Sequence, residues 1–221
     1  MKKIALPLII ASILLHGCIN FQQTTKLYKD GSGESFIHFW TEIIKDSTDN
    51  FKLNFFNEDS LISKFTSPFC NLTDSEVYRN FRDSTIHAKI WFNFDDIEKL
   101  GNIKGLEGNI FEYKTISEKE KIFTHKINIP YFFTSDTAAS INMSYTYYLP
   151  GNILEHNADR VSTNELTWFF NQDDLINDLT IRARIEPFKL KETPVWIYYI
   201  ALFVILILIL FFFVKKNNSI F

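Results

Sequence analysis

The sequence predicts a β-rich α+β domain: a mostly antiparallel sheet of about eight strands, a few short helices and one C-terminal transmembrane helix. Three observations support this class. Apolar and polar residues alternate with a period of two in several segments, turn-forming residues separate neighbouring segments, and residues 195–214 form one uncharged apolar stretch. Because the connections between neighbouring segments are short, we expect antiparallel pairing.

The chain begins with a segment typical of a secretory signal peptide. Two lysines precede an apolar segment at residues 4–15, and Gly17 is the small residue that a signal peptidase requires before its cut. Because Cys18 follows directly, the LHGC sequence at 15–18 resembles the lipobox of bacterial lipoproteins. The resemblance implies cleavage between Gly17 and Cys18 and a diacylglyceryl thioether on Cys18. An ordinary secretion signal followed by a chance cysteine is the alternative.

The predicted strands come next along the chain. They are Phe21–Lys29, Glu34–Thr41, residues 86–94, 108–116, 121–129, 141–149, 161–170 and 179–186. Asp30-Gly31-Ser32-Gly33 has the composition of a hairpin turn with positive φ values. Pro150-Gly151 suits the centre of a type II turn, so we expect the chain to reverse there before Val161.

Short helices are predicted at two places. Asn57 is placed to cap a helix at Glu58–Phe65, where Leu61, Ile62 and Phe65 share one face. Asp95-Asp96-Ile97-Glu98 has the spacing of an N-cap followed by an acidic residue that reaches back.

Residues 195–214 have the length and composition of a membrane span. About 20 residues at a rise of 1.5 Å match the hydrocarbon core of a bilayer. Trp196 and Tyr198 lie at the start of the segment, and Lys215 and Lys216 follow its end. The signal peptide sets the orientation and leaves 215–221 in the cytoplasm. The alternatives are a buried core helix and a removable sorting tail.

These signals divide the chain into five parts. They are a signal peptide at 1–17, an extracytoplasmic β-rich domain at 18–186, a tether at 187–194, a transmembrane helix at 195–214 and a cytoplasmic tail at 215–221. The two anchors predict a location at the cytoplasmic membrane, with the domain on the periplasmic side and the lipid bilayer as a partner.

Composition narrows the possible partners. The net charge is -3, no block of Lys or Arg occurs, and 16% of residues are aromatic, with 23 Phe. Nucleic acid is therefore not an expected partner. Once Cys18 is acylated only Cys70 remains, so we expect no internal disulfide and a small buried side chain at Cys70.

Few residues suggest chemistry. Two similar segments, 91–97 and 168–175, each end in paired aspartates. The pairs are interpreted as helix caps, with a catalytic or calcium role as the alternative. The histidines are scattered without an HExxH motif, and His125 is expected to be a hydrogen-bonded core residue rather than a ligand. We expect no catalytic residue, metal or cofactor. A hydrolase would require convergence of the residues Asp95, Asp96, Asp173, Asp174 or His125.

The order of several short motifs resembles the LppM-type bacterial envelope lipoproteins. The motifs are the lipobox, a strand, the turn at 29–33, Leu149-Pro150-Gly151-Asn152 with Asn157, Leu166-Thr167-Trp168, and a C-terminal span followed by two lysines. The resemblance implies a β-rich exposed domain and a non-enzymatic interaction with envelope lipids or glycolipids. It transfers no binding residues.

The sequence therefore predicts a membrane-anchored lipoprotein that is not an enzyme and whose extracytoplasmic domain binds an envelope lipid or amphiphile. A scaffold or assembly partner of an envelope protein complex is one alternative. A hydrolase acting on cell-envelope substrates is the other.

Overall fold

The structure is a computed structural model that describes residues 18–43, 56–117, 119–128, 140–176, 179–187, 199–200, 202–205 and 207. The predicted signal peptide and most of the predicted span at 195–214 lie outside the described residues. Within the described residues, no helix is long and apolar enough to cross a bilayer. The chain divides into two units, Met1–Pro187 and Phe188–Phe221.

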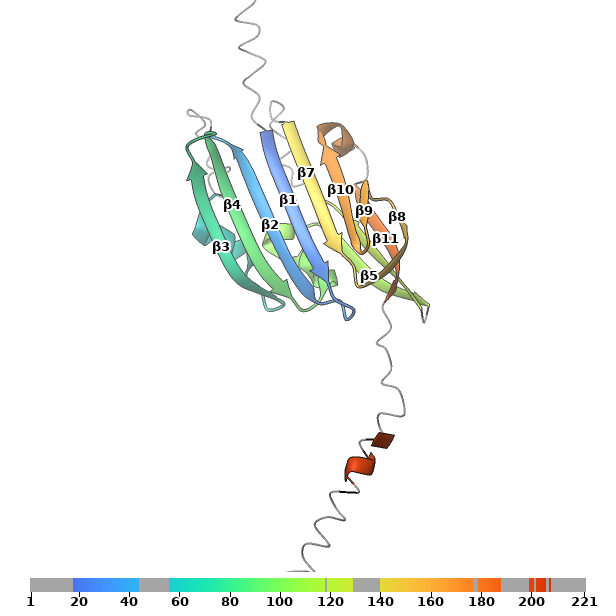
Figure 1. Cartoon of the computed structure of the whole chain (residues 1–221). Helices are drawn as coiled ribbons and strands as arrows, with labels where there is room; N and C mark the ends of the chain where they lie inside the picture. The colour runs from blue at the N-terminus through green and yellow to red at the C-terminus, as the bar shows by residue number, and fades with distance from the viewer. Residues whose placement is uncertain are drawn as a thin grey trace, which may run out of the picture. The chain divides into compact units, whose positions relative to one another are not determined.

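The first unit contains a seven-stranded sheet (Figure 1). In spatial order its strands are β3 (Cys70–Asn80), β4 (Thr85–Phe94), β2 (Gly33–Glu42), β1 (Cys18–Leu27), β7 (Ser140–Tyr148), β10 (Glu165–Asn171) and β9 (Arg160–Ser162). All neighbours are antiparallel except β1 and β7, which are parallel. The β-rich α+β prediction is confirmed, and the sheet is mixed rather than purely antiparallel.

A second, four-stranded sheet packs behind the first (Figure 1). Its strands, in spatial order, are β5 (Ile110–Ser117), β6 (Glu120–Lys126), β11 (Thr180–Pro187) and β8 (Gly151–His156). The two sheets meet through their apolar faces, where the ring of Tyr147 on β7 lies 4.7 Å from that of Phe123 on β6. One hydrophobic core therefore fills the space between them.

Helical segments cover the rest of the inner face of the large sheet. The helix α3 (Glu58–Phe65) buries Leu61 and Phe65 completely, and the Phe65 ring lies 5.6 Å from that of Phe92 on β4. Asn57 caps α3 as predicted, because its Oδ1 accepts the Ser60 N–H at 2.9 Å. The 3-10 segments are η1 (Ile97–Asn102), η2 (Lys104–Leu106) and η3 (Gln172–Ile176).

One predicted strand and one predicted turn differ from the structure. Residues 161–170 form not one strand but the β9–β10 hairpin, in which Thr163 has a φ of 35°. Pro150-Gly151 is not a type II turn, since Gly151 has no positive φ and its N–H donates to Leu149 O at 3.0 Å. The chain instead passes from β7 in one sheet to β8 in the other. A Cβ at Gly151 would collide with the carbonyl oxygen of Glu186, which explains the glycine.

The predicted β1–β2 turn is confirmed. Gly31 has a φ of 95°, and Asp30 Oδ1 accepts hydrogen bonds from the Ser32 N–H and hydroxyl at 3.1 and 2.7 Å. The turn joins two strands whose register is continuous from Leu27↔Gly33 to Ile19↔Thr41.

Candidate functional site

The outer face of the seven-stranded sheet carries the candidate site. The helices and the second sheet all pack on its other face, and no described element covers the outer face (Figure 1). On β2 and β4, alternation directs Phe36, His38, Trp40 and Trp91 outward, and each is only half-buried. A sheet face that meets water normally carries small polar residues, so this aromatic surface indicates contact with a ligand or partner.

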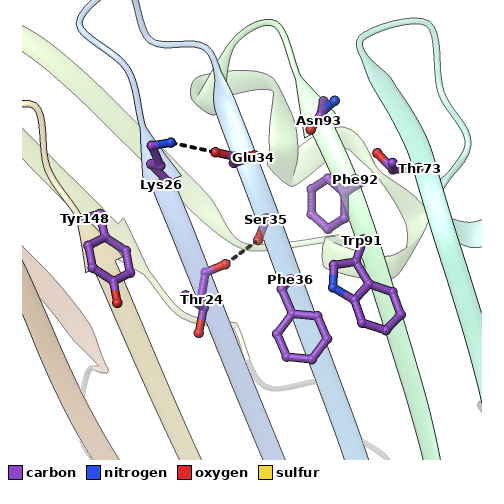
Figure 2. A pocket seen from close by; sticks show the side chains of 10 residues that line it. All are labelled: Thr24, Lys26, Glu34, Ser35, Phe36, Thr73, Trp91, Phe92, Asn93 and Tyr148. Atoms are coloured by element: carbon purple, nitrogen blue, oxygen red, sulfur yellow. Dashed lines mark hydrogen bonds and ion pairs between the residues drawn. The ribbon is translucent and has the colours of Figure 1, made fainter.

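An open groove of 340 Å³ lies on this face (Figure 2). Its lining residues are Thr24, Lys26, Glu34, Ser35, Phe36, Thr73, Trp91, Phe92, Asn93 and Tyr148. Phe36 and Trp91 are opposite each other in the β2–β4 register, with ring centroids 4.8 Å apart. Tyr148 stands on β7, on the other side of β1. Aromatic side chains from three strands thus form an apolar lining.

An ion pair adds polar groups at the groove. Lys26 Nζ lies 2.9 Å from Glu34 Oε1, and the Tyr28 hydroxyl donates to the same oxygen at 2.9 Å. The hydrogen bond from Lys26, followed by that from Tyr28, lowers the pKa of Glu34. Because both partners are about half exposed, the pair adds little stability. It leaves the groove with both signs of charge and no net excess.

A bulge in β3 contributes a hydroxyl group. Leu72 pairs with Phe92 and Asp74 with Trp91, so Thr73 is the extra residue between them. Bulges of this kind redirect a side chain, and Thr73 lines the groove from the strand next to that of Trp91, on the side away from Phe36 (Figure 2). No local sequence pattern indicates the groove, because its residues come from five strands and only the register brings them together.

A pair of histidines lies further along the same face. His38 Nε2 is 3.0 Å from His87 Nδ1, and His87 Nε2 is 2.7 Å from the Thr85 hydroxyl oxygen. The Thr85 hydroxyl donates to Asp83 Oδ1. Since a carboxylate has no proton to give, Thr85 must accept from His87 Nε2–H, and His87 Nδ1 must accept from His38 Nε2–H.

Aromatic rings enclose this pair. Tyr78 stacks on His87 at 4.7 Å with an interplanar angle of 4°, and Trp40 lies 4.5 Å from His38. Burial, with the nearby His87 and Lys89 as smaller causes, lowers the pKa of His38 to about 4. Burial also lowers the pKa of His87. Both imidazoles are therefore neutral at pH 7.

His125 confirms its prediction as a core residue. It is 1% exposed, its Nε2–H donates to Asn109 Oδ1 at 2.9 Å, and its Nδ1 accepts the Tyr147 hydroxyl at 2.9 Å. Burial lowers its pKa to about 3. Cys70 is buried as predicted, and burial raises its pKa to about 11, so its thiol is not a nucleophile at pH 7.

The aspartate pairs do not come together. Asp95 and Asp96 follow the end of β4, beside Gly33, whereas Asp173 and Asp174 follow the end of β10, where Asn171 pairs with Asn142. The β1–β7 register places these points at opposite ends of the large sheet.

Asp96 caps η1 as predicted, whereas at η3 the Asn171 side chain accepts the Asp173 N–H and Asp174, inside the segment, reaches back to Asn171. Asp96 Oδ1 accepts the Glu98 N–H at 3.0 Å. Asp174 Oδ2 accepts the Asn171 N–H at 2.8 Å. Among the described residues, no group of three or more His, Cys, Asp or Glu could hold a metal ion.

Comparison with known proteins shows a likeness to a solved structure. No protein-family model matches the sequence, and no curated protein matches it. The NMR structure of the LppM folded domain from Mycobacterium tuberculosis is similar to this chain, with 12% sequence identity and a TM-score of 0.47. The match covers 79% of this chain and 94% of that one.

Proposed function

We propose that this protein is a membrane-anchored bacterial lipoprotein whose extracytoplasmic domain binds an amphiphile in the groove on the outer face of the seven-stranded sheet. Cleavage after Gly17 and acylation of Cys18 anchor the N-terminus of the domain in the membrane. Residues 195–214 anchor its C-terminus in the cytoplasmic membrane. The domain faces the periplasm and acts by binding, without catalysis and without nucleic acid as a partner.

The groove lining is the observation that carries the proposal. Phe36, Trp91 and Tyr148 offer an apolar surface to a hydrocarbon chain, and the Lys26–Glu34 pair offers polar atoms to a headgroup. Pockets for small amphiphilic molecules combine apolar walls with a few polar groups in this way. The volume of 340 Å³ fits one short chain segment or headgroup rather than a whole phospholipid.

Photolabelling in a bilayer tests the proposal. The full chain in nanodiscs is exposed to a single-chain lysophospholipid that carries a diazirine, and the adducts are located by peptide mass spectrometry. We expect saturable labelling of peptides from β2, β4 and β7. Trp91→Ser removes a groove wall and should reduce this labelling about tenfold, since burying a large aromatic contact contributes more than 1.4 kcal/mol.

Phe81→Ser is the matched control. Phe81 is 85% exposed and lies outside the groove lining, so this variant should label like the parent protein. Equal labelling of the Trp91→Ser variant would contradict the amphiphile site. Crosslinking of the same outer face to another envelope protein, without amphiphile adducts, would favour the scaffold role instead.

A further inference from the structure

His38 and His87 meet on the outer sheet face although 49 positions separate them in the sequence. In the β2–β4 register, Lys89 is opposite His38 and Trp40 is opposite His87, so the two histidines are diagonal neighbours that point to the same side. Sequence spacing does not indicate the pair, since no local motif contains both residues. The structure therefore supplies a two-nitrogen cluster that the sequence does not predict.

The distance between the two nitrogens suits a single metal ion. His38 Nε2 and His87 Nδ1 are 3.0 Å apart. With metal–nitrogen bonds of about 2.0 Å, this separation corresponds to a ligand–metal–ligand angle of roughly 95°. Such an angle is that of adjacent ligands in a square-planar or tetragonal site, the geometry of Cu²⁺, and is narrower than the tetrahedral angle that Zn²⁺ prefers.

The surroundings of His87 match those of a metal ligand. Metal-binding histidines usually donate their second ring N–H to an oxygen that fixes the tautomer. His87 Nε2–H donates to the Thr85 hydroxyl, which is itself held by Asp83, and this leaves the Nδ1 lone pair directed at His38. Stacking on Tyr78 fixes the plane of the His87 ring.

The local charges do not oppose a cation. Lys89 is a positive group opposite His38, but Glu76 pairs with it at 3.2 Å and its Nζ lies 4.6 Å from the centre of the Tyr78 ring. Asp83 adds a negative charge behind Thr85. The two carboxylates and the one ammonium group around the pair therefore carry a net negative charge, which favours a bound cation.

We propose that His38 and His87 form a Cu²⁺ site, with His38 Nε2 and His87 Nδ1 as adjacent ligands and water in the remaining positions. On binding, the proton on His38 moves from Nε2 to Nδ1, the hydrogen bond between the rings is lost, and the lone pairs of His38 Nε2 and His87 Nδ1 bind the ion. No net proton is released, because both imidazoles start neutral. The site goes beyond the proposed amphiphile function and does not depend on it.

Copper titration of the full chain in nanodiscs tests this site. The Trp40 ring lies 4.5 Å from that of His38, so bound Cu²⁺ should quench tryptophan fluorescence saturably at one equivalent, and Trp40→Phe should remove most of the quenching. Electron paramagnetic resonance should show a tetragonal Cu²⁺ with two imidazole nitrogens. Zn²⁺ should compete more weakly, as expected from the usual order of metal affinities.

Single substitutions give the decisive comparison. His38→Gln and His87→Gln should each weaken Cu²⁺ binding at least about tenfold, and the double variant should lose little more, because one ion needs both ligands. His156→Gln, at an exposed histidine on β8, should bind like the parent protein. Unchanged affinity in both single variants, or a resonance spectrum with one nitrogen or none, would overturn the proposal. Near-ultraviolet circular dichroism confirms that each variant is folded.

Discussion

His125 anchors a buried chain of polar side chains between the two sheets. Its Nδ1 accepts the Tyr147 hydroxyl, and Gln23 Nε2 donates to Tyr147 Oη at 3.4 Å and to Thr25 Oγ1 at 3.0 Å. The Thr25 and Ser35 hydroxyls are 2.9 Å apart. Because all five side chains of this network take part in these hydrogen bonds, the network fixes how the sheets pack without a large desolvation cost.

Acid should destabilise the domain through His125. Its pKa is about 3 in the folded chain and ordinarily 6.5, so the unfolded state binds more protons between these values. The contribution of His125 to the unfolding free energy is therefore fully present above pH 6.5 and is lost as the pH falls toward 3. The loss between pH 7 and pH 4 is on the order of 3 kcal/mol. His125→Gln keeps a hydrogen-bonding side chain that does not titrate, so its unfolding free energy in urea should fall less steeply on acidification.

The comparison is made on full chains in non-ionic detergent at pH 7, 5.5 and 4. His156→Gln serves as the control, since His156 is exposed and should leave the wild-type pH profile unchanged. Parallel profiles for the wild type and His125→Gln would show that His125 does not carry the acid response.

At the scale of elements, alternation predicted the central strands and missed most edge strands. The residues of β4 and β11 have one face on the core, so the sequence period of two is clear. β3, β8 and β9 are edge strands, with many exposed residues on both faces, and they show no such period. The parallel pairing of β1 with β7 was also not predictable, because it joins segments more than 100 residues apart.

Local sequence patterns also decide which residues of the candidate site were predictable. His125 was predictable as a core residue from its own strand, since its neighbours at every second position are apolar. The groove and the His38–His87 pair depend on which strands are neighbours and on their register. A single sequence contains no local signal for either.

Helix α3 should depend measurably on its cap. Asn57→Ala removes the acceptor for the Ser60 N–H and should lower the unfolding free energy by about 1 kcal/mol, as measured by urea denaturation of the full chain in detergent. Asn57→Asp keeps an acceptor and should be nearly neutral. A loss as large for Asn57→Asp as for Asn57→Ala would show that the cap is not the cause.

The passage from β7 to β8 should not tolerate a side chain at Gly151. Gly151→Ala places a Cβ against the Glu186 carbonyl and the Pro187 backbone and should cost about 1–3 kcal/mol in the same denaturation experiment. Asn152→Ala, at the exposed next position, should change stability by less than about 0.5 kcal/mol. A stable Gly151→Ala variant would contradict the close approach of β8 and β11.

At the scale of the whole molecule, the two proposed anchors can be tested separately. Cys18 should carry the lipid, so mature protein from bacterial membranes should incorporate alkyne-palmitate, and Cys18→Ser should abolish this labelling and leave the signal peptide attached. A chain ending at Pro187 should keep the label and stay in the membrane fraction, because two acyl chains suffice for stable anchoring. Unlabelled wild-type protein beginning after another cleavage point would support the ordinary secretion signal.

We propose the outer face of the seven-stranded sheet as the binding face of the protein. Fluorine resonance of the full chain in nanodiscs, with fluorotryptophan at all four Trp positions, tests it directly. On addition of a single-chain lysophospholipid, the Trp91 resonance should shift saturably, while that of Trp168, which is 1% exposed in the core, should not move. A Trp91 resonance that stays unchanged while the Trp196 resonance responds would show that the outer face does not bind the lysophospholipid.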